Sequence, residues 1–340
     1  MLGLKKNKKD KDGKRKSEKK EKKGKDKKSV GSSEDVAAPV YSTKAQRTLL
    51  VIDSESRDWA PLFSPVQGLK VEQCGWKDMI VQAESNGQAL VNFLTATKET
   101  KVCQPDFVLV RQLVRGLCED ELYTNALYGL LFAGIPAVNS IDSIHQGLER
   151  PAVYAALRGG KDKFPLIPMS YYSHAKAMRF TPDFPLVAKI GSAEAGYGKM
   201  RFQTSDDFGD FRGVVALHKD YVTLEKLIED REYDIRVQKV GTHLRAYKRM
   251  NSNWKGNVGT CVLEEIEVTD TFREWAEECG KLFGGMDILT VDAIHSKDGK
   301  DYILEINDTA SGFAPANMEE DMRHVRDLVL QRMHEAYPDD

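Results

Sequence analysis

LVAKIGSAEAGYGKM (186–200) places three glycines within eight residues, directly after an apolar run. A glycine-rich loop of this kind suggests phosphate binding, and the obvious comparison is the P-loop, G-x-x-x-x-G-K-[ST]. Gly191 and Gly196 have its spacing, but Tyr197 occupies the lysine position. The later Gly-Lys pair is followed by Met200, which has no hydroxyl for magnesium. The P-loop is thereby excluded. Two alternatives remain: a hairpin turn that uses glycine for its positive φ, and a phosphate-binding loop of another kind.

A second informative stretch is DILTVDAIHSKDGKDYILEIND (287–308), which is predicted to be a β-hairpin around a Ser-Lys-Asp-Gly turn. Asp292 and Glu305 would face each other on paired strands, and Asn307 would share the face of Glu305. Such an oxygen-only ligand set suits Mg²⁺, Mn²⁺ or Ca²⁺, with phosphates completing the coordination shell. The alternative is the polar outer face of an ordinary hairpin. The apolar neighbours of Glu305 favour the metal, because an unpaired carboxylate there would be costly.

Candidate nucleotide contacts lie between these two stretches. Lys189 ends the strand before the glycine loop, and Lys239 lies inside the strand-like IRVQKVG. The alternative for either lysine is a side chain that merely extends to water. EKLI (225–228) offers a backbone carbonyl and, two residues later, an amide that suit an adenine base. Further polar candidates on the way to the hairpin are Arg236, Arg249 and Asn257.

The part of the chain before residue 141 alternates between predicted strands and a helix, which favours a small α/β domain with a mainly parallel sheet. The helix, EDELYTNALYGLLFAG (119–134), has an acidic first turn and a terminal glycine. ALVNFLTAT (89–97) is ambiguous between strand and helix. The strands are predicted at 47–53, 69–76, 105–112 and 135–140.

The region from residue 141 onward is predicted to begin with a helix and then to consist mainly of strands joined by short turns. An amphipathic helix is predicted at 271–285, with Thr269 or Asp270 as its N-cap and Gly284-Gly285 at its end. The strand-like segments before this helix are 184–190, 221–228, 233–241, 243–250 and 259–268.

Charge divides the chain sharply. Residues 1–28 hold 15 Lys or Arg against five Asp or Glu, a net charge of +10, whereas the whole chain carries −2. The segment lacks the apolar residues that a core needs, so we expect a disordered tail. Such a tail suits an anionic membrane, and nucleic-acid binding or a localisation signal are the alternatives. Ser17, within KRKS, resembles a site for basophilic kinases.

Cysteine use and hydropathy narrow the class of protein. The five cysteines (74, 103, 118, 261 and 279) are scattered, without a C-x-x-C pair or a disulfide framework. No apolar run approaches the length of a membrane span, and no apolar segment of the signal-peptide type follows the basic start. We therefore expect a soluble protein of a reducing compartment.

The order of these motifs resembles the ATP-grasp fold: a strand ending in lysine, a glycine-rich lid loop, an E-K-φ-φ hinge, D-I-R, and finally an acidic residue and E-x-N. The resemblance implies that the glycine loop covers a triphosphate between two antiparallel strands. It divides the chain into a tail and linker (1–46), a Rossmann-like pre-ATP-grasp domain (47–140) and an ATP-grasp domain (141–338) with its lid at about 181–245.

A narrower resemblance rests on long blocks such as LLVIDSESRDWAPLF, FPLVAKIGSAEAGYGKM, NSNWKGNVGTCVLEEI and FGGMDILTVDAIHSKDGKDYILEIND. Over about 47–335 the chain is similar to the central domain of the synapsins. This implies an ATP-binding, cytoplasmic phosphoprotein, peripheral on synaptic vesicles at presynaptic terminals, that regulates vesicle clustering and neurotransmitter release. The implied partners are further copies of the chain, as a homodimer or higher oligomer, the anionic vesicle membrane and actin, rather than nucleic acid.

The motifs described above and the resemblance together give the predicted site residues. The predicted metal, calcium or magnesium, would be held by Asp292, Glu305 and Asn307. The predicted ATP-binding residues are Lys189, Gly196, Gly198, Lys199, Glu225, Lys226, Leu227, Ile228, Arg236, Lys239, Arg249, Asn257 and Glu305.

The sequence departs from the synapsin pattern in four places. Asp292 is one methylene shorter than the glutamate of some synapsins, and 309–321 differs from the usual continuation. The R-R-x-S segment and the Pro/Gln-rich regions are absent from this sequence.

Two function classes follow from these resemblances. The first is a regulatory protein that binds ATP without turnover and self-associates on vesicles. The second is an ATP-grasp carboxylate–amine ligase that acts through an acyl phosphate, for which Arg236 and Arg249 would supply a cationic clamp beside the γ-phosphate. An ATP–metal site serves both, so it does not distinguish an enzyme from a binding protein.

Overall fold

The computed structural model describes residues 46–338 except 55, 96, 117–120, 161–162, 180–181, 194–195, 251–253 and 255–261. The predicted tail and linker therefore lie outside the described residues, apart from Gln46. The same holds for Ser17, Asn257, Cys118 and Cys261. The other three cysteines are buried free thiols.

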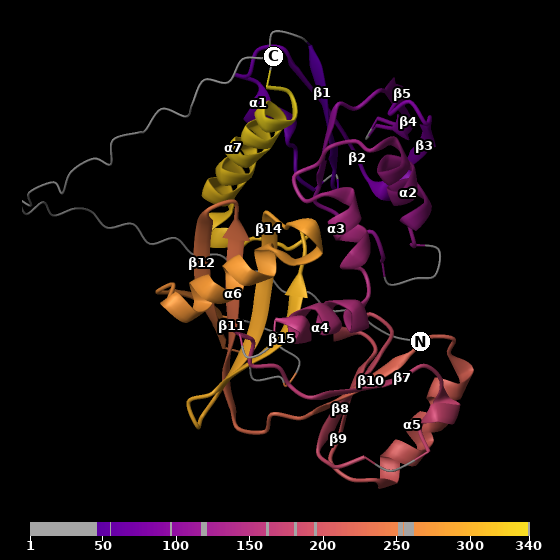
Figure 1. Ribbon diagram of the computed structural model, residues 1–340, viewed down its shortest axis with the longest axis vertical. Helices are drawn as coiled ribbons and strands as arrows, with labels where there is room; N and C mark the ends of the chain where they lie inside the picture. Colours follow the sequence, from indigo (N-terminus) through magenta and orange to yellow (C-terminus); the bar gives the residue numbers. More distant parts are fainter. Residues whose placement is uncertain are drawn as a thin grey trace, which may run out of the picture. The chain divides into compact units, whose positions relative to one another are not determined.

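The first sheet is parallel and has the order β2-β1-β6 (Figure 1). Its central strand, β1, is an apolar run because both of its faces are covered. Leu50 and Ile52 pack toward one cluster of apolar side chains, and Leu49 and Val51 pack toward another, which contains the C-terminal helix α7. The three strands predicted here are confirmed as β1 (Arg47–Ile52), β2 (Leu69–Cys74) and β6 (Phe107–Val110).

A second, antiparallel sheet, β3-β4-β5, packs beside the first and was not predicted. The ambiguous segment 89–97 forms a strand over Ala89–Leu94, in which buried side chains alternate with less buried ones. The predicted strand at 135–140 is wrong in extent, since only an isolated bridge joins Ala137 to Val108. The new strands are β3 (Met79–Ala83), β4 (Ala89–Leu94) and β5 (Thr100–Cys103).

The helix predicted at 119–134 begins later, at Thr124, so its acidic residues precede it. It ends as predicted at Gly134, whose φ of 66° suits glycine. The helices before residue 163 are α1 (Ala60–Phe63), α2 (Thr124–Ala133), α3 (Ile141–Gln146) and α4 (Arg150–Gly159). Short 3₁₀ helices within the described residues are η1 (Trp76–Asp78), η3 (Ala175–Ala177), η5 (Leu282–Gly284) and η6 (Pro315–Asn317).

The third sheet, β7-β10-β8-β9, is antiparallel and has a core of its own. Phe202, Phe208 and Phe211 pack against one another between this sheet and α5, with ring centroids 5.1–5.9 Å apart. We call residues 169–226 the lid. Its elements are β7 (Met169–Tyr172), β8 (Leu186–Ile190), β9 (Lys199–Phe202), α5 (Asp206–Leu217) and β10 (Val222–Lys226).

The fourth sheet is antiparallel, with the order β13-β12-β11-β14-β15. Helix α6 covers one face, where Trp275, Ala276 and Cys279 are buried, and Thr269 caps it by accepting a hydrogen bond from the Phe272 amide. The elements of this part of the chain are β11 (Arg231–Val240), β12 (His243–Met250), β13 (Val262–Ile266), α6 (Asp270–Gly280), β14 (Ile288–Ser296), β15 (Asp301–Asn307) and α7 (Met318–Ala336).

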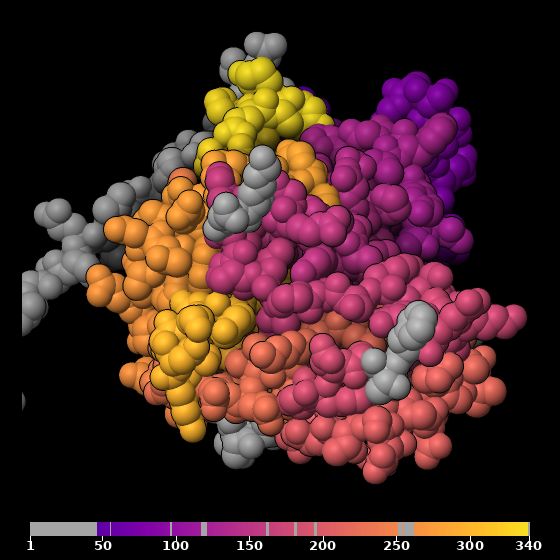
Figure 2. Space-filling model, turned by 60° about the horizontal axis from the view of Figure 1, so that its bottom comes forward, coloured from indigo at the N-terminus to yellow at the C-terminus, as the bar shows by residue number. Residues whose placement is uncertain are grey.

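The predicted lid boundary at residue 245 differs from this arrangement. Strand β11 pairs with β12 and β14, so residues 231–245 belong to the fourth sheet. The Lys297 amide donates to the Asp230 carbonyl at 2.8 Å, which brings the β14–β15 turn against the connection that leaves the lid. Figure 2 shows this gold hairpin turn beside the salmon residues of the lid.

Two buried polar side chains join other parts of the chain to the fourth sheet. Asn139 donates to the Ile288 carbonyl at 2.8 Å, and its own oxygen accepts from the amides of Asp287 and Ile288. Asp321 on α7, which is fully buried, accepts from Gln238 at 2.8 Å and from Arg245 at 3.0 Å. Within the described part of the chain, none of the helices has the length and apolar character of a membrane span.

Replacing Asn139 with alanine should destabilise the fold, because three backbone groups at the start of β14 would lose their partner. At roughly 1 kcal/mol for each lost bond, the free energy of unfolding should fall by about 3 kcal/mol. Urea denaturation of the full chain measures this. Asn92→Ala, on the outer face of β4, is the control and should change stability little; equal effects of the two substitutions would contradict the assigned role.

Candidate functional site

A cleft lies between the lid and the fourth sheet, and Glu225, Asp292 and Glu305 line both of its lobes. We call the first the hinge lobe, a cavity of about 400 Å³ bordered by Val187, Lys189, Lys199, Lys226, Leu227, Ile228, Arg249 and Trp254. We call the second the α4 chamber, a cavity of about 280 Å³ bordered by Leu148, Val153, Leu157, Arg236, Asp308, Ser311 and Gly312.

The predicted pairing of the two carboxylates is confirmed. Asp292 on β14 lies directly opposite Glu305 on β15, and Thr290 lies opposite Asn307. Asn307 donates to Asp292 Oδ2 at 3.0 Å. The other oxygen, Asp292 Oδ1, is buried, accepts no hydrogen bond from any described residue and lies 3.7 Å from Arg236. Two carboxylates and an amide thus converge on one side of the hairpin.

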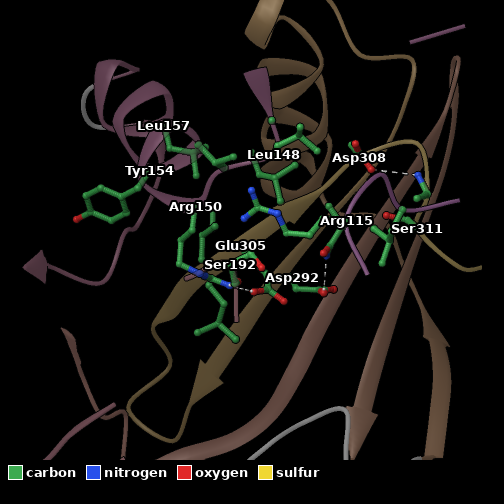
Figure 3. Close-up of a pocket in the computed structure, with 18 of the residues that line it drawn as sticks. Arg115, Leu148, Arg150, Tyr154, Leu157, Ser192, Asp292, Glu305, Asp308 and Ser311 are labelled. Atoms are coloured by element: carbon green, nitrogen blue, oxygen red, sulfur yellow. Dashed lines mark hydrogen bonds and ion pairs between the residues drawn. The ribbon is translucent and has the colours of Figure 1, made fainter. Parts of the chain in front are cut away.

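Cations from two other parts of the chain surround Glu305. Arg150, the first residue of α4, donates to Glu305 at 2.7 Å (Figure 3). Lys199 of β9 lies 3.5 Å from Glu305. Burial alone would raise the pKa of Glu305, but Lys199, Arg150 and Lys189 outweigh it and hold the pKa well below its usual range. Glu305 is therefore a carboxylate throughout the physiological range.

Lys189 is almost completely buried at the centre of the lid sheet. Its ammonium donates to both oxygens of Glu225, at 2.7 and 2.5 Å, from the neighbouring strand β10. Burial lowers the pKa of Lys189 to about 8, although the charge of Glu225 opposes that shift. The sequence alternative of a lysine that reaches bulk water is therefore wrong for this residue.

The glycine loop joins β8 to β9 as a hairpin, with Lys189 opposite Lys199. Gly198 has a φ of 66°, and a side chain there would approach the Ile190 carbonyl to 3.1 Å. Gly196 lines the hinge lobe, whereas Gly198 serves the turn by accepting from the Ile190 amide. The turn thus brings Lys199 over the cleft, as a phosphate-covering loop requires.

Residues 226–228 leave the end of β10 and border the hinge lobe. The Leu227 amide donates to the Pro185 carbonyl at 3.1 Å, which fixes the segment against the start of β8. Arg249 enters the same lobe from β12, opposite Asp234.

Lys239 is not in this cleft, so its assignment to the nucleotide site is incorrect. Side chains alternate along β11, and Lys239 shares the face of Val237, under α6. Its ammonium donates to the Gly241 carbonyl at 2.7 Å. Arg236, three residues earlier, points to the opposite face and borders the α4 chamber.

Arg150 is the main site residue that the sequence analysis missed. Its guanidinium also donates to the Ser192 carbonyl at 3.4 Å, so it joins the glycine loop to the carboxylates of the predicted metal site. Its partner Glu305 lies 155 positions later, and no periodic pattern links the two. The only local signal was an arginine at the start of a helix.

Comparisons with known proteins point to one family. Residues 42–137 match the family model for the synapsin pre-ATP-grasp domain, and residues 139–335 match that for the synapsin ATP-binding domain. A relative named "Synapsin" from Drosophila melanogaster is 31% identical over 315 residues, which cover 87% of this chain. The chain spans about 30% of that relative.

Solved structures with a similar fold are ATP-grasp proteins. One is the ATP-grasp ligase PsnB in complex with a minimal precursor, with a TM-score of 0.60, 15% identity and coverage of 85% of this chain and 99% of that one. Another is a D-alanyl-alanine synthetase A from Vibrio cholerae, with a TM-score of 0.57, 13% identity and coverage of 86% and 99%. At these identities the likeness establishes the fold alone. Together with the two family models, it shows that the chain belongs to the synapsin family and has an ATP-grasp domain that binds ATP.

Proposed function

We propose that the hinge lobe binds ATP together with a divalent metal. The observation that carries this assignment is the convergence of Arg150 and Lys199 on Glu305, beside Asp292. Cations in the cleft suit the phosphates, and 226–228 offer backbone groups for the base. The proposed phosphate contacts are Lys189, Arg150, Lys199 and Gly196.

The donor set fits a metal that prefers oxygen. Within the described residues no cluster of three or more His, Cys, Asp or Glu side chains could hold a metal alone. Asp292, Glu305 and Asn307 offer two carboxylates and an amide, and the buried Asp292 Oδ1 has the capacity for another partner. Phosphate oxygens would complete the shell, as is usual for Mg²⁺ and also possible for Ca²⁺. When bound, the metal would neutralise phosphate charge.

At the level of the cell, we propose a peripheral vesicle protein whose self-association responds to ATP. Family membership supports this role, and so does the net charge of +10 in residues 1–28, which suits an anionic leaflet. Actin is a further proposed partner. The ligase alternative keeps one supporting observation, the α4 chamber on the far side of Glu305, and it shares the ATP-grasp fold.

Glu305→Gln should weaken metal-dependent ATP binding roughly 100-fold, about 2.7 kcal/mol. The substitution removes the charge that holds the metal but keeps the side-chain volume. Calorimetric titration of ATP with and without Mg²⁺ or Ca²⁺ measures the effect. Glu264→Gln, at an exposed position on β13, should bind like the unaltered chain. Full affinity and full metal dependence in Glu305→Gln would reject this metal site.

ATP affinity should fall as the pH rises above about 8. The phosphates favour the charged form of Lys189, so above its pKa binding must take up a proton, which costs about tenfold in affinity per pH unit. Below that pKa the lysine is already charged, and affinity should be level. Titrations across this range should show the step, and Lys189→Gln should bind weakly without it. The same step in both proteins would assign it to another group.

The vesicle role is tested by flotation with phosphatidylserine vesicles and by sedimentation. We expect deletion of residues 1–28 to lower flotation and to leave ATP affinity unchanged, and we expect added salt to weaken flotation of the full chain. MgATP should shift the sedimentation of the full chain but not that of Glu305→Gln. Flotation that survives the deletion at low salt would show that the tail does not bind the membrane.

A further inference from the structure

Both chain connections of the lid sheet lie at one of its ends. Strands β7 and β10 run antiparallel, so Met169 lies opposite Glu225 and Tyr172 lies opposite Val222. The chain therefore enters the lid before β7 and leaves it after β10 at the same end of the sheet, which we call the attached end. The opposite end, near Val222, is called the free end. Movement of the lid about its connections would displace the free end most.

The glycine loop also lies at the free end. Ile190, the last residue of β8, pairs with Val222, and the loop follows directly. The Gly191 amide donates to the Tyr221 carbonyl at 2.9 Å, which joins the first residue of the loop to the residue before β10. A contact that holds Tyr221 in place therefore also holds the start of the loop over the cleft.

Glu149, which directly precedes α4, holds the side chain of Tyr221. The Tyr221 hydroxyl donates to Glu149 Oε2 at 2.8 Å, and Arg115, after β6, donates to Glu149 Oε1 at 2.6 Å. Burial and the hydrogen bond to Glu149 raise the pKa of Tyr221, so the hydroxyl keeps its proton and remains a donor. Figure 1 shows α4 beside the lid strands β7 and β10. One carboxylate thus joins the lid to the segment after β6.

The helix itself does not use the Glu149 carboxylate. Glu149 is the N-cap residue of α4, but its side chain makes no capping hydrogen bond. Its backbone carbonyl begins the helix by accepting from the amides of Ala152 and Val153. Acidic side chains at this position usually accept from an amide of their own helix. Here the carboxylate instead turns to Arg115 and Tyr221.

The contact between Glu149 and Tyr221 differs from the other polar contacts of the free end. Arg150 reaches the Ser192 carbonyl at 3.4 Å, and Lys199 lies 3.5 Å from Glu305. Both of those contacts are longer, and their cations are proposed to bind phosphate, so ATP would change them. Neither partner of the shorter contact is among the described residues that line the hinge lobe or the α4 chamber. It can therefore form with or without ATP.

We propose that Glu149 is a positioning residue that holds the free end of the lid closed and thereby sets how fast ATP enters and leaves the cleft. Its contact with Tyr221 stabilises the closed lid to the same extent with and without ATP. Loss of the contact lets the lid open more often in both states. Entry and release then both become faster, while affinity hardly changes. The inference rests on the proposed ATP site for these rates, whereas the contact itself does not.

Tyr221→Phe removes the hydroxyl and keeps the ring. Stopped-flow fluorescence of the full chain with a fluorescent ATP analogue and Mg²⁺ measures both rate constants. Each should rise about tenfold, the lower range for loss of a hydrogen bond to a charged acceptor, with the dissociation constant unchanged. Tyr171→Phe is the matched control, because this exposed ring lies 5.5 Å from that of Tyr221, and it should leave both rates unaltered. Unaltered rates in Tyr221→Phe, or faster release alone, would overturn the proposal.

Two further measurements separate the contact from the ATP site. Glu149→Ala combined with Tyr221→Phe should be no faster than either single variant, because both changes remove one contact. Rates that multiply in the combined variant would contradict the assigned role. Without any nucleotide, hydrogen exchange of the glycine loop should be faster in Tyr221→Phe than in the unaltered chain, and equal exchange would reject the role of Glu149. Failure of the unaltered chain to bind the ATP analogue would instead reject the proposed ATP site, so the two failures are distinguishable.

Discussion

Glu305 is a largely buried carboxylate that two cations from distant parts of the chain approach, Arg150 from α4 and Lys199 from the lid. Without such partners its burial would be costly, and its pKa would rise instead of falling. This requirement brings α4, the glycine hairpin and β15 together at one point. The same charge pattern explains why the cleft suits phosphates and a divalent cation at once.

The other sheets hold this point in position through side chains that bind backbone. Asn139 supplies β14 with three hydrogen bonds from outside its sheet, and Arg111 holds the turn that follows Asn307. Both residues are at least nine-tenths buried, so their bonds are made where water does not compete. The first domain therefore supports the β14–β15 hairpin, although it contributes none of the ligands proposed for the metal.

Much of the fold could be predicted because it follows from local patterns in the sequence. The buried strands, the cap at Thr269 and the facing of Asp292 and Glu305 all follow from short-range spacing. The ATP-grasp order of motifs and the synapsin resemblance were also readable from the chain, and the family and the fold are confirmed. The sheet β3-β4-β5 escaped notice, because its strands are short and its outer face keeps apolar residues such as Ile80 and Val102 exposed.

The site was predicted less evenly, since it depends on contacts far apart in sequence. Arg150 acts through a residue 155 positions away, which no local pattern encodes. Lys239 was assigned to the nucleotide because its strand resembles a motif, but the period of two along β11 turns it toward α6. The proposed role of the residues at 226–228 rests on backbone groups, so their side chains reveal little about it.

The separate aromatic core of the lid has a consequence for how the family can change over time. Since Phe202, Phe208 and Phe211 pack among themselves and α5, replacements there alter the lid without disturbing the other cores. The rest of the fold can thus keep its architecture while the lid accumulates substitutions. Three charged side chains of the lid, Lys189, Lys199 and Glu225, belong to the chemistry of the cleft. Natural variation should spread through α5 and stop at those three side chains.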